Sequence, residues 1–122
     1  FTMELADLSV RARAAGYRTL VAPGAEATHD LQRSAGLRST LYTYYIVRNR
    51  FRYIRKFYRR AALSLTLVWL LYGVLLSAKL RVSGDPASGR AVWLGTSDGV
   101  RGRWGGQNDR VLAACRPGAR QP

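Results

Sequence analysis

The stretch ELADLSVRARAAGYRTLVAPGAEATH, residues 4–29, decides the fold that this sequence predicts. Its first half has apolar residues at helical spacing, namely Leu5, Leu8, Ala12 and Ala15. Gly16 then supplies the left-handed turn that commonly ends a helix. A short β-prone run at residues 19–21, a Pro-Gly turn and a second short strand ending at His29 follow. We therefore expect an αββ unit over residues 1–36.

Acidic side chains lie at the start of the expected helix. Asp7 precedes Arg11 by four residues, the favourable order for an ion pair on a helix. The αββ arrangement would bring His29, at the end of a strand, opposite the helix start that carries Glu4 and Asp7.

The composition limits the class of protein. A chain of 122 residues is long enough for one small domain, and because it begins at Phe1 we interpret it as the C-terminal fragment of a longer protein. Twenty lysines and arginines against seven acids give a net charge of +13, which predicts a polyanionic neighbour: nucleic acid, anionic lipid or a diphosphate. The lone Cys115 excludes an internal disulfide and indicates a reducing compartment.

Three further segments follow the αββ unit. Residues 37–60 combine arginines and tyrosines at helical spacing and predict one long basic aromatic helix, suited to nucleic acid or to an anionic bilayer surface. Residues 61–82 predict an apolar, membrane-associated helix, for which we favour a position at the membrane interface over a true span. Residues 83–122 form a Gly/Arg-rich tail with a short helix over 87–100, and we expect disorder from Gly106 on.

The order of several short motifs resembles a known family. They are Asp7-Leu8-x-x-Arg11, Gly16-Tyr17-Arg18, Pro23, His29, Ser34 and Tyr44-Tyr45-x-x-Arg48-Asn49-Arg50. Together they resemble the catalytic end of family 2 glycosyltransferases, the rhamnosyltransferase-like group with a GT-A fold, over about half of the chain. The resemblance implies an α/β fragment, mostly helical: the C-terminal part of a GT-A nucleotide-diphospho-sugar transferase fold, followed by basic and apolar helices.

The resemblance also implies a catalytic site. Sugar transfer needs a carboxylate base and a divalent cation, Mg²⁺ or Mn²⁺, to neutralise the departing diphosphate. The candidate catalytic acids are Glu4, which aligns with the first acid of the family's acidic pair, and Asp7, which lies one helical turn away from the base position. The family's metal-binding histidine corresponds to His29. The base position itself falls on Leu5, which cannot accept a proton. Three explanations stay open: an inactive or divergent copy, a base role for Glu4, or an error in the sequence.

Substrate contacts are implied for Ser34, Arg48 and Asn49, because a forked arginine fits a diphosphate and a loop serine can close over a donor. The implied partners are a nucleotide-sugar donor, a glycan or lipid-linked acceptor and a membrane surface, at the cytoplasmic face of the cell membrane, with no nucleic acid expected. Cell-surface polysaccharide synthesis is the implied process. We expect no transfer by the chain alone, and the alternative is a non-enzymatic basic helical protein that binds nucleic acid or membranes.

Overall fold

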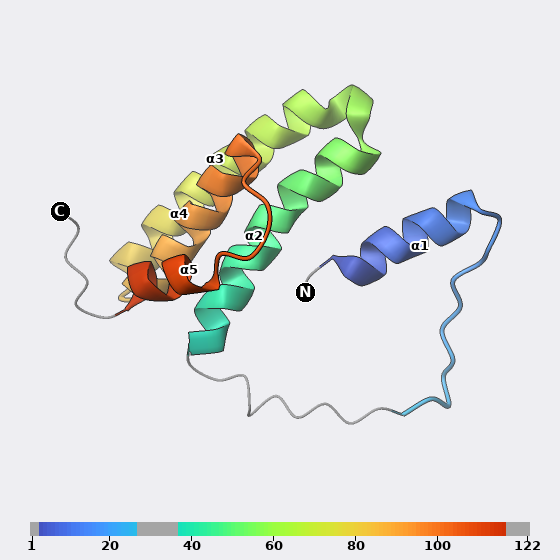
Figure 1. Cartoon of the computed structure of the whole chain (residues 1–122), viewed down its shortest axis with the longest axis horizontal. Coiled ribbons are helices and arrows are strands. Elements are labelled where there is room, and N and C mark those ends of the chain that lie inside the picture. Colours follow the sequence, from blue (N-terminus) through green and yellow to red (C-terminus); the bar gives the residue numbers. More distant parts are fainter. Residues whose placement is uncertain (1–2, 27–36, 117–122) are drawn as a thin grey trace.

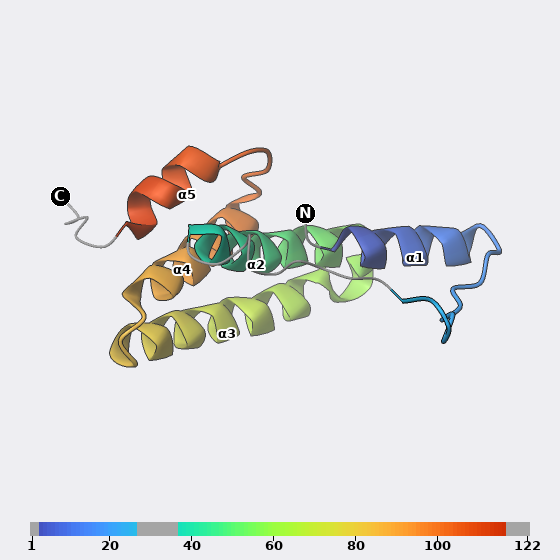
Figure 2. The same cartoon turned by 90° about the horizontal axis from the view of Figure 1, so that it is seen from below.

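The computed structural model describes residues 3–26 and 37–116, and this part of the chain is helical (Figure 1). Its helices are α1 (Glu4–Ala14), α2 (Leu37–Phe57), α3 (Ala62–Val82), α4 (Pro86–Arg101) and α5 (Asn108–Cys115), with a 3-10 turn at Arg59–Ala61 between α2 and α3. α4 packs against both α2 and α3. Figure 2 shows α3 and α5 on opposite sides of α2, so the bundle has a layered order.

The α/β fold that we expected is wrong, because the described residues contain no strand. The β-prone run at residues 19–21 has no regular structure, and Val21 is 90% exposed. A strand is stabilised by neighbouring strands, and even a two-stranded hairpin is marginal alone. Residues 27–36, with His29, Ser34 and the end of the expected second strand, lie outside the described residues. The described chain is a helical bundle and not the end of a GT-A sheet.

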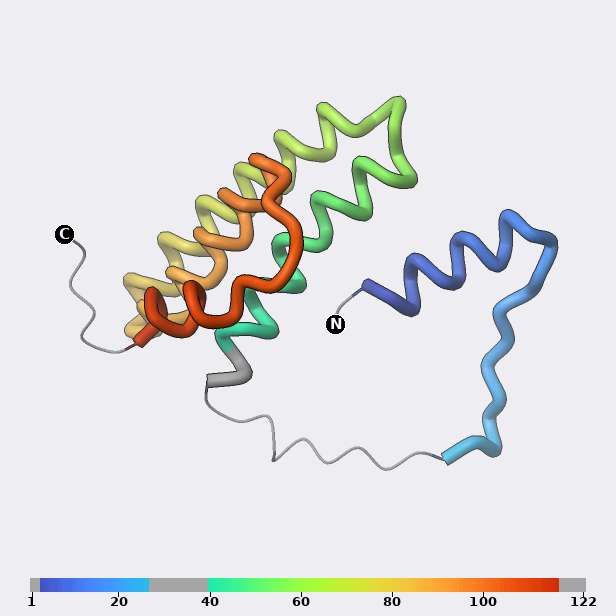
Figure 3. Tube along the Cα trace, in the orientation of Figure 1, coloured from blue at the N-terminus to red at the C-terminus, as the bar shows by residue number. Residues whose placement is uncertain are grey.

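The helix expected near the N-terminus is confirmed, together with its glycine stop. α1 ends in a turn in which Gly16 has φ 88° and the amide of Tyr17 donates to the carbonyl of Ala12 at 2.9 Å. This pairing satisfies a carbonyl that the helix end would otherwise leave unbonded. The trace in Figure 3 shows α1 standing apart from the other helices, and none of its residues is buried. α1 is therefore held by a few polar contacts, described below.

Glycines allow α4 to lie very close to its neighbours. A Cβ added to Gly95 would lie 2.7 Å from the carbonyl oxygen of Tyr44 in α2, and one on Gly99 would lie 2.3 Å from the ring of Phe51. On its other side, a Cβ on Gly73 of α3 would collide with a side chain of α4. Small residues at helix contacts let backbones approach in this way. The close approach fixes the position of α2 relative to α3.

The ends of α4 are specified by local sequence. Asp85 caps the first turn by accepting a hydrogen bond from the backbone amide of Ser88 at 3.0 Å, and Pro86 occupies a first-turn position that needs no amide proton. Gly102 ends the helix in the left-handed region with φ 71°. These caps direct the chain back over α2.

The tail forms a helix where we expected disorder. α5 buries Val111 and Cys115 against Tyr44 of α2 and Ala91 of α4. Burial raises the pKa of the Cys115 thiol, so the thiol stays protonated at neutral pH. This short helix makes apolar contacts with residues far away in sequence. The free energy gained by this burial offsets the conformational entropy lost in ordering the glycine-rich loop before it.

Candidate anion-binding cleft

α1, α2 and the loop at Gly105 enclose an open cleft with a volume of about 460 Å³. Four of the six residues that we predicted for the site line this cleft, although they come from two segments that are distant in sequence. They are Glu4, Asp7, Arg48 and Asn49. The other two, His29 and Ser34, lie outside the described residues. Leu5, at the family's base position, is 80% exposed and does not line the cleft.

The α2 wall of the cleft includes three residues that were not predicted for the site, Tyr45, Arg52 and Lys56. Tyr45, Asn49, Arg52 and Lys56 recur every three or four residues, so they share one side of the helix. That spacing is present in the sequence, but the resemblance implied substrate contacts in this helix only for Arg48 and Asn49. The cleft holds more cations, Arg11 and Arg48 included, than its two acids can neutralise. The arrangement favours an anionic ligand.

Asp7 links α1 to α2. Its carboxylate accepts a hydrogen bond from Nε of Arg11 at 2.7 Å, and its second oxygen pairs with the ammonium of Lys56. The hydrogen bond from Lys56, followed by that from Arg11, lowers the pKa of Asp7 below its ordinary value. Asp7 is consequently an ionised structural partner at neutral pH and is poorly suited to accept a proton.

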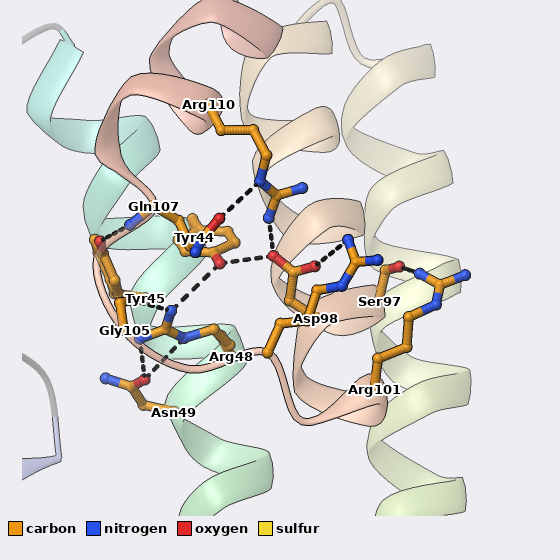
Figure 4. Close-up of polar contacts among 11 residues, drawn as sticks. Tyr44, Tyr45, Arg48, Asn49, Ser97, Asp98, Arg101, Gly105, Gln107 and Arg110 are labelled. Atoms are coloured by element: carbon orange, nitrogen blue, oxygen red, sulfur yellow. Dashed lines mark hydrogen bonds and ion pairs between the residues drawn. The ribbon is translucent and has the colours of Figure 1, made fainter.

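Arg48 is built into the protein interior and is only 5% exposed (Figure 4). Its guanidinium donates to the carbonyl of Gly105 at 2.7 Å, to Oδ1 of Asn49 at 3.1 and 3.2 Å, and to the hydroxyl of Tyr44 at 3.4 Å. It also lies 4.7 Å from the ring centre of Tyr45. Most of its donors are used by the protein, so Arg48 shapes the cleft wall more than it offers a free fork to a ligand.

Asp98 is the centre of a polar network that the sequence did not reveal (Figure 4). This carboxylate is 1% exposed, accepts a hydrogen bond from the hydroxyl of Tyr44 at 2.7 Å and pairs with Arg110 of α5. Burial, and then the contact with Asp98, raise the pKa of the Tyr44 hydroxyl. Since Tyr44 also contacts Arg48, the network ties α5 and α4 to the cleft wall.

The described residues do not fit a divalent cation. They contain no group of three or more histidine, cysteine or acidic side chains placed to hold a metal ion. In the cleft, both oxygens of Asp7 face cations, which compete with a metal for the carboxylate. The expected Mg²⁺ or Mn²⁺ therefore has no ligand set among these residues, and we assign no chemical step to it.

A second surface stands out on α3. Together with the 3-10 turn before it, α3 forms a continuous helical segment, Arg59–Val82, with a mean hydropathy of 2.0. By length and composition only, this segment is long and apolar enough to cross a membrane. In its most apolar part only 11% of residues are buried. A core helix of a soluble protein meets the same criteria of length and composition but is mostly buried. α3 therefore differs from such a core helix in its exposure.

Comparison of the chain with protein-family models, with curated proteins and with solved structures gave no significant match.

Proposed function

We propose that the chain is a membrane-associated helical part of a glycosyltransferase that acts at the cytoplasmic face of the cell membrane. Its donor would be a nucleoside diphosphate sugar and its acceptor a glycan or a lipid-linked glycan. The observation that carries the proposal is the convergence of Glu4, Asp7, Arg48 and Asn49 on one cation-rich cleft. The second support is the order and spacing of the motifs around these residues, which resemble those of the family.

Within this proposal the cleft residues have different roles. Arg52 and Lys56 are exposed cations of the cleft and would contact the diphosphate oxygens. Arg48 would position the wall, because its donors are used internally. Of the explanations for Leu5, a base role for Glu4 is best supported, because Glu4 lines the cleft while Leu5 points to solvent.

Binding of inorganic pyrophosphate to the chain, measured by isothermal titration calorimetry, tests the cleft. Arg52→Gln and Lys56→Gln should each weaken binding about tenfold, because a hydrogen bond to a charged group contributes about 1.5–3 kcal/mol. Arg13→Gln is the matched control, since this exposed cation of α1 does not line the cleft. The cleft is rejected if pyrophosphate does not bind, or if the control weakens binding equally.

Sugar transfer by the full-length protein tests the enzymatic part. Glu4→Gln removes the cleft carboxylate and keeps its shape, so transfer should fall by at least about a hundredfold while pyrophosphate binding remains. Undiminished transfer by this variant would remove Glu4 from the reaction.

The net charge of +13 favours one other function, a non-enzymatic helical protein that binds nucleic acid. Filter binding to RNA and DNA at two salt concentrations separates the two, because phosphate contacts make such binding steeply salt-dependent. Tight, salt-sensitive nucleic-acid binding without pyrophosphate binding would establish this alternative in place of the glycosyltransferase.

A further inference from the structure

The outer face of α3 is broad and apolar. It consists of exposed aliphatic side chains, namely Leu63, Leu67, Leu71, Val74, Leu75 and Val82. At about 100° per residue these positions span about a third of the helix circumference. Lys79 and Arg81, at the C-terminal end, fall at the two edges of this face, where long side chains can keep their charges in water while their stems cover apolar surface. The distribution matches a helix that meets a bilayer from one side.

The packing of α4 against α3 fixes how α3 can meet a bilayer. Ser77 of α3 donates to the carbonyl of Gly89 in α4 at 2.8 Å, and Gly73 of α3 lies directly against Thr96 of α4. α4 carries Arg90 and the buried Asp98, so it cannot follow α3 into hydrocarbon without great cost. A bilayer can therefore reach only the outer face of α3, and the helix must lie in the membrane plane.

One cation lies where the outer face of α3 meets α2. The guanidinium of Arg50 is 3.8 Å from the ring centre of Trp69, whose ring contacts Tyr72 edge-on at 5.2 Å. Arg50 makes no hydrogen bond or ion pair within the described part of the chain, although it is partly buried. Burial lowers the pKa of Arg50, but arginine still stays charged at neutral pH.

Such a cation fits a lipid phosphate. A guanidinium presents forked donors to phosphate oxygens, and tryptophan and tyrosine are enriched at the level of lipid headgroups. Tyr72 is half exposed at the border of the outer face, which is the depth that a headgroup would occupy if the aliphatic residues entered the acyl-chain boundary.

We propose that α3 lies in the plane of an anionic bilayer and that Arg50, with Trp69 and Tyr72, binds the phosphate of a lipid headgroup at the border between α2 and α3. This inference rests on the proposed membrane location and adds to it a defined lipid contact. It also separates the bilayer from the anion-binding cleft, because the cleft residues of α2 lie on the side of that helix away from Arg50.

Partitioning of the chain into vesicles tests the site, with phosphatidylcholine alone compared with an equal mixture of phosphatidylcholine and phosphatidylglycerol. Arg50→Gln should weaken binding to the anionic vesicles at least about fivefold, the effect of losing one cation at a charged membrane surface. Arg52→Gln removes the same charge two residues away, on the cleft side of α2. A helix is about 10 Å across and the Debye length is about 8 Å, so this control should change binding less than about twofold.

Three results are decisive. A larger loss for Arg50→Gln than for Arg52→Gln, with unchanged helix content by circular dichroism, supports the lipid-phosphate site. Equal losses for the two variants, with the wild type bound, overturn the site but leave membrane docking of α3 intact. Failure of the wild type to bind either vesicle overturns membrane docking itself, and with it the membrane part of the proposed function.

Discussion

Replacing Gly95 by alanine is the sharpest test of the packing that holds the bundle together. The new Cβ would lie 2.7 Å from the carbonyl oxygen of Tyr44 and 3.1 Å from Cβ of Val47, whereas ordinary contact begins at 3.4 Å. The first obstacle is backbone, so no side-chain rotation relieves it and α4 must move away from α2. Overpacking of this kind costs about 1–3 kcal/mol.

Helix propensity acts in the opposite direction, so the sign of the change in unfolding free energy shows which effect is larger. Alanine is favoured over glycine inside a helix by about 1 kcal/mol, so a Gly95→Ala variant free of the clash would be more stable than the wild type. With the clash, we expect a net loss of about 1 kcal/mol and a fall in melting temperature of about 4 °C.

Thermal unfolding followed by circular dichroism measures this change. Gly106→Ala is the matched control, because a Cβ at this loop glycine meets nothing within 4 Å and its φ is not in the left-handed range. The control should be neutral or slightly stabilising, since alanine restricts the unfolded chain. A Gly95→Ala protein as stable as the control, or more stable, would refute the close approach of α4 to α2.

Two further predictions concern the polar contacts. Tyr44→Phe removes the buried donor to Asp98 and should cost about 1–3 kcal/mol in urea unfolding. The pKa of Tyr44 is raised, so the stability that its hydroxyl contributes is complete below the ordinary pKa of tyrosine, 10.0, and is lost as pH rises through the raised pKa. The wild type should show this loss of stability at alkaline pH, and Tyr44→Phe should not. The pKa of Asp7 is lowered, so the ion pair of Asp7 with Lys56, which joins α1 to α2, is fully formed above the ordinary pKa of 3.8. This ion pair is lost as pH falls through the lowered pKa. Hydrogen exchange of the α1 amides should accelerate in acid beyond the intrinsic trend, and Lys56→Gln should flatten this response; an identical response in both proteins would contradict the contact.

Local chemistry could be predicted from the sequence, and long-range packing could not. The Asp7–Arg11 pair and the Gly16 stop are confirmed because each depends on a few adjacent residues. The strand at residues 19–21 is wrong because a β-prone run becomes a strand only beside another strand, and the described residues supply none. α5 escaped prediction because its burial depends on Tyr44 and Ala91, which are remote in sequence.

The candidate site shows the same division. The resemblance implied six site residues, and four of them line the cleft. The structural role observed for Arg48 could not be predicted from its motif, because its acceptor, the carbonyl of Gly105, lies in the loop between α4 and α5. Nothing in the sequence around Asp98 marks it as the buried partner of Tyr44 and Arg110.

Three arginines of α2 show why net charge alone says little about function. Arg48, Arg50 and Arg52 are separated by two residues each, so successive members point about 200° apart around the helix. The first is enclosed by protein acceptors, the second lies on Trp69 beside the outer face of α3, and the third lines the cleft. In the functions proposed above only the last two would meet an anion, a lipid phosphate at Arg50 and a diphosphate at Arg52. The proposals therefore give three neighbouring charges three different roles, and substituting these arginines one at a time tests each role separately.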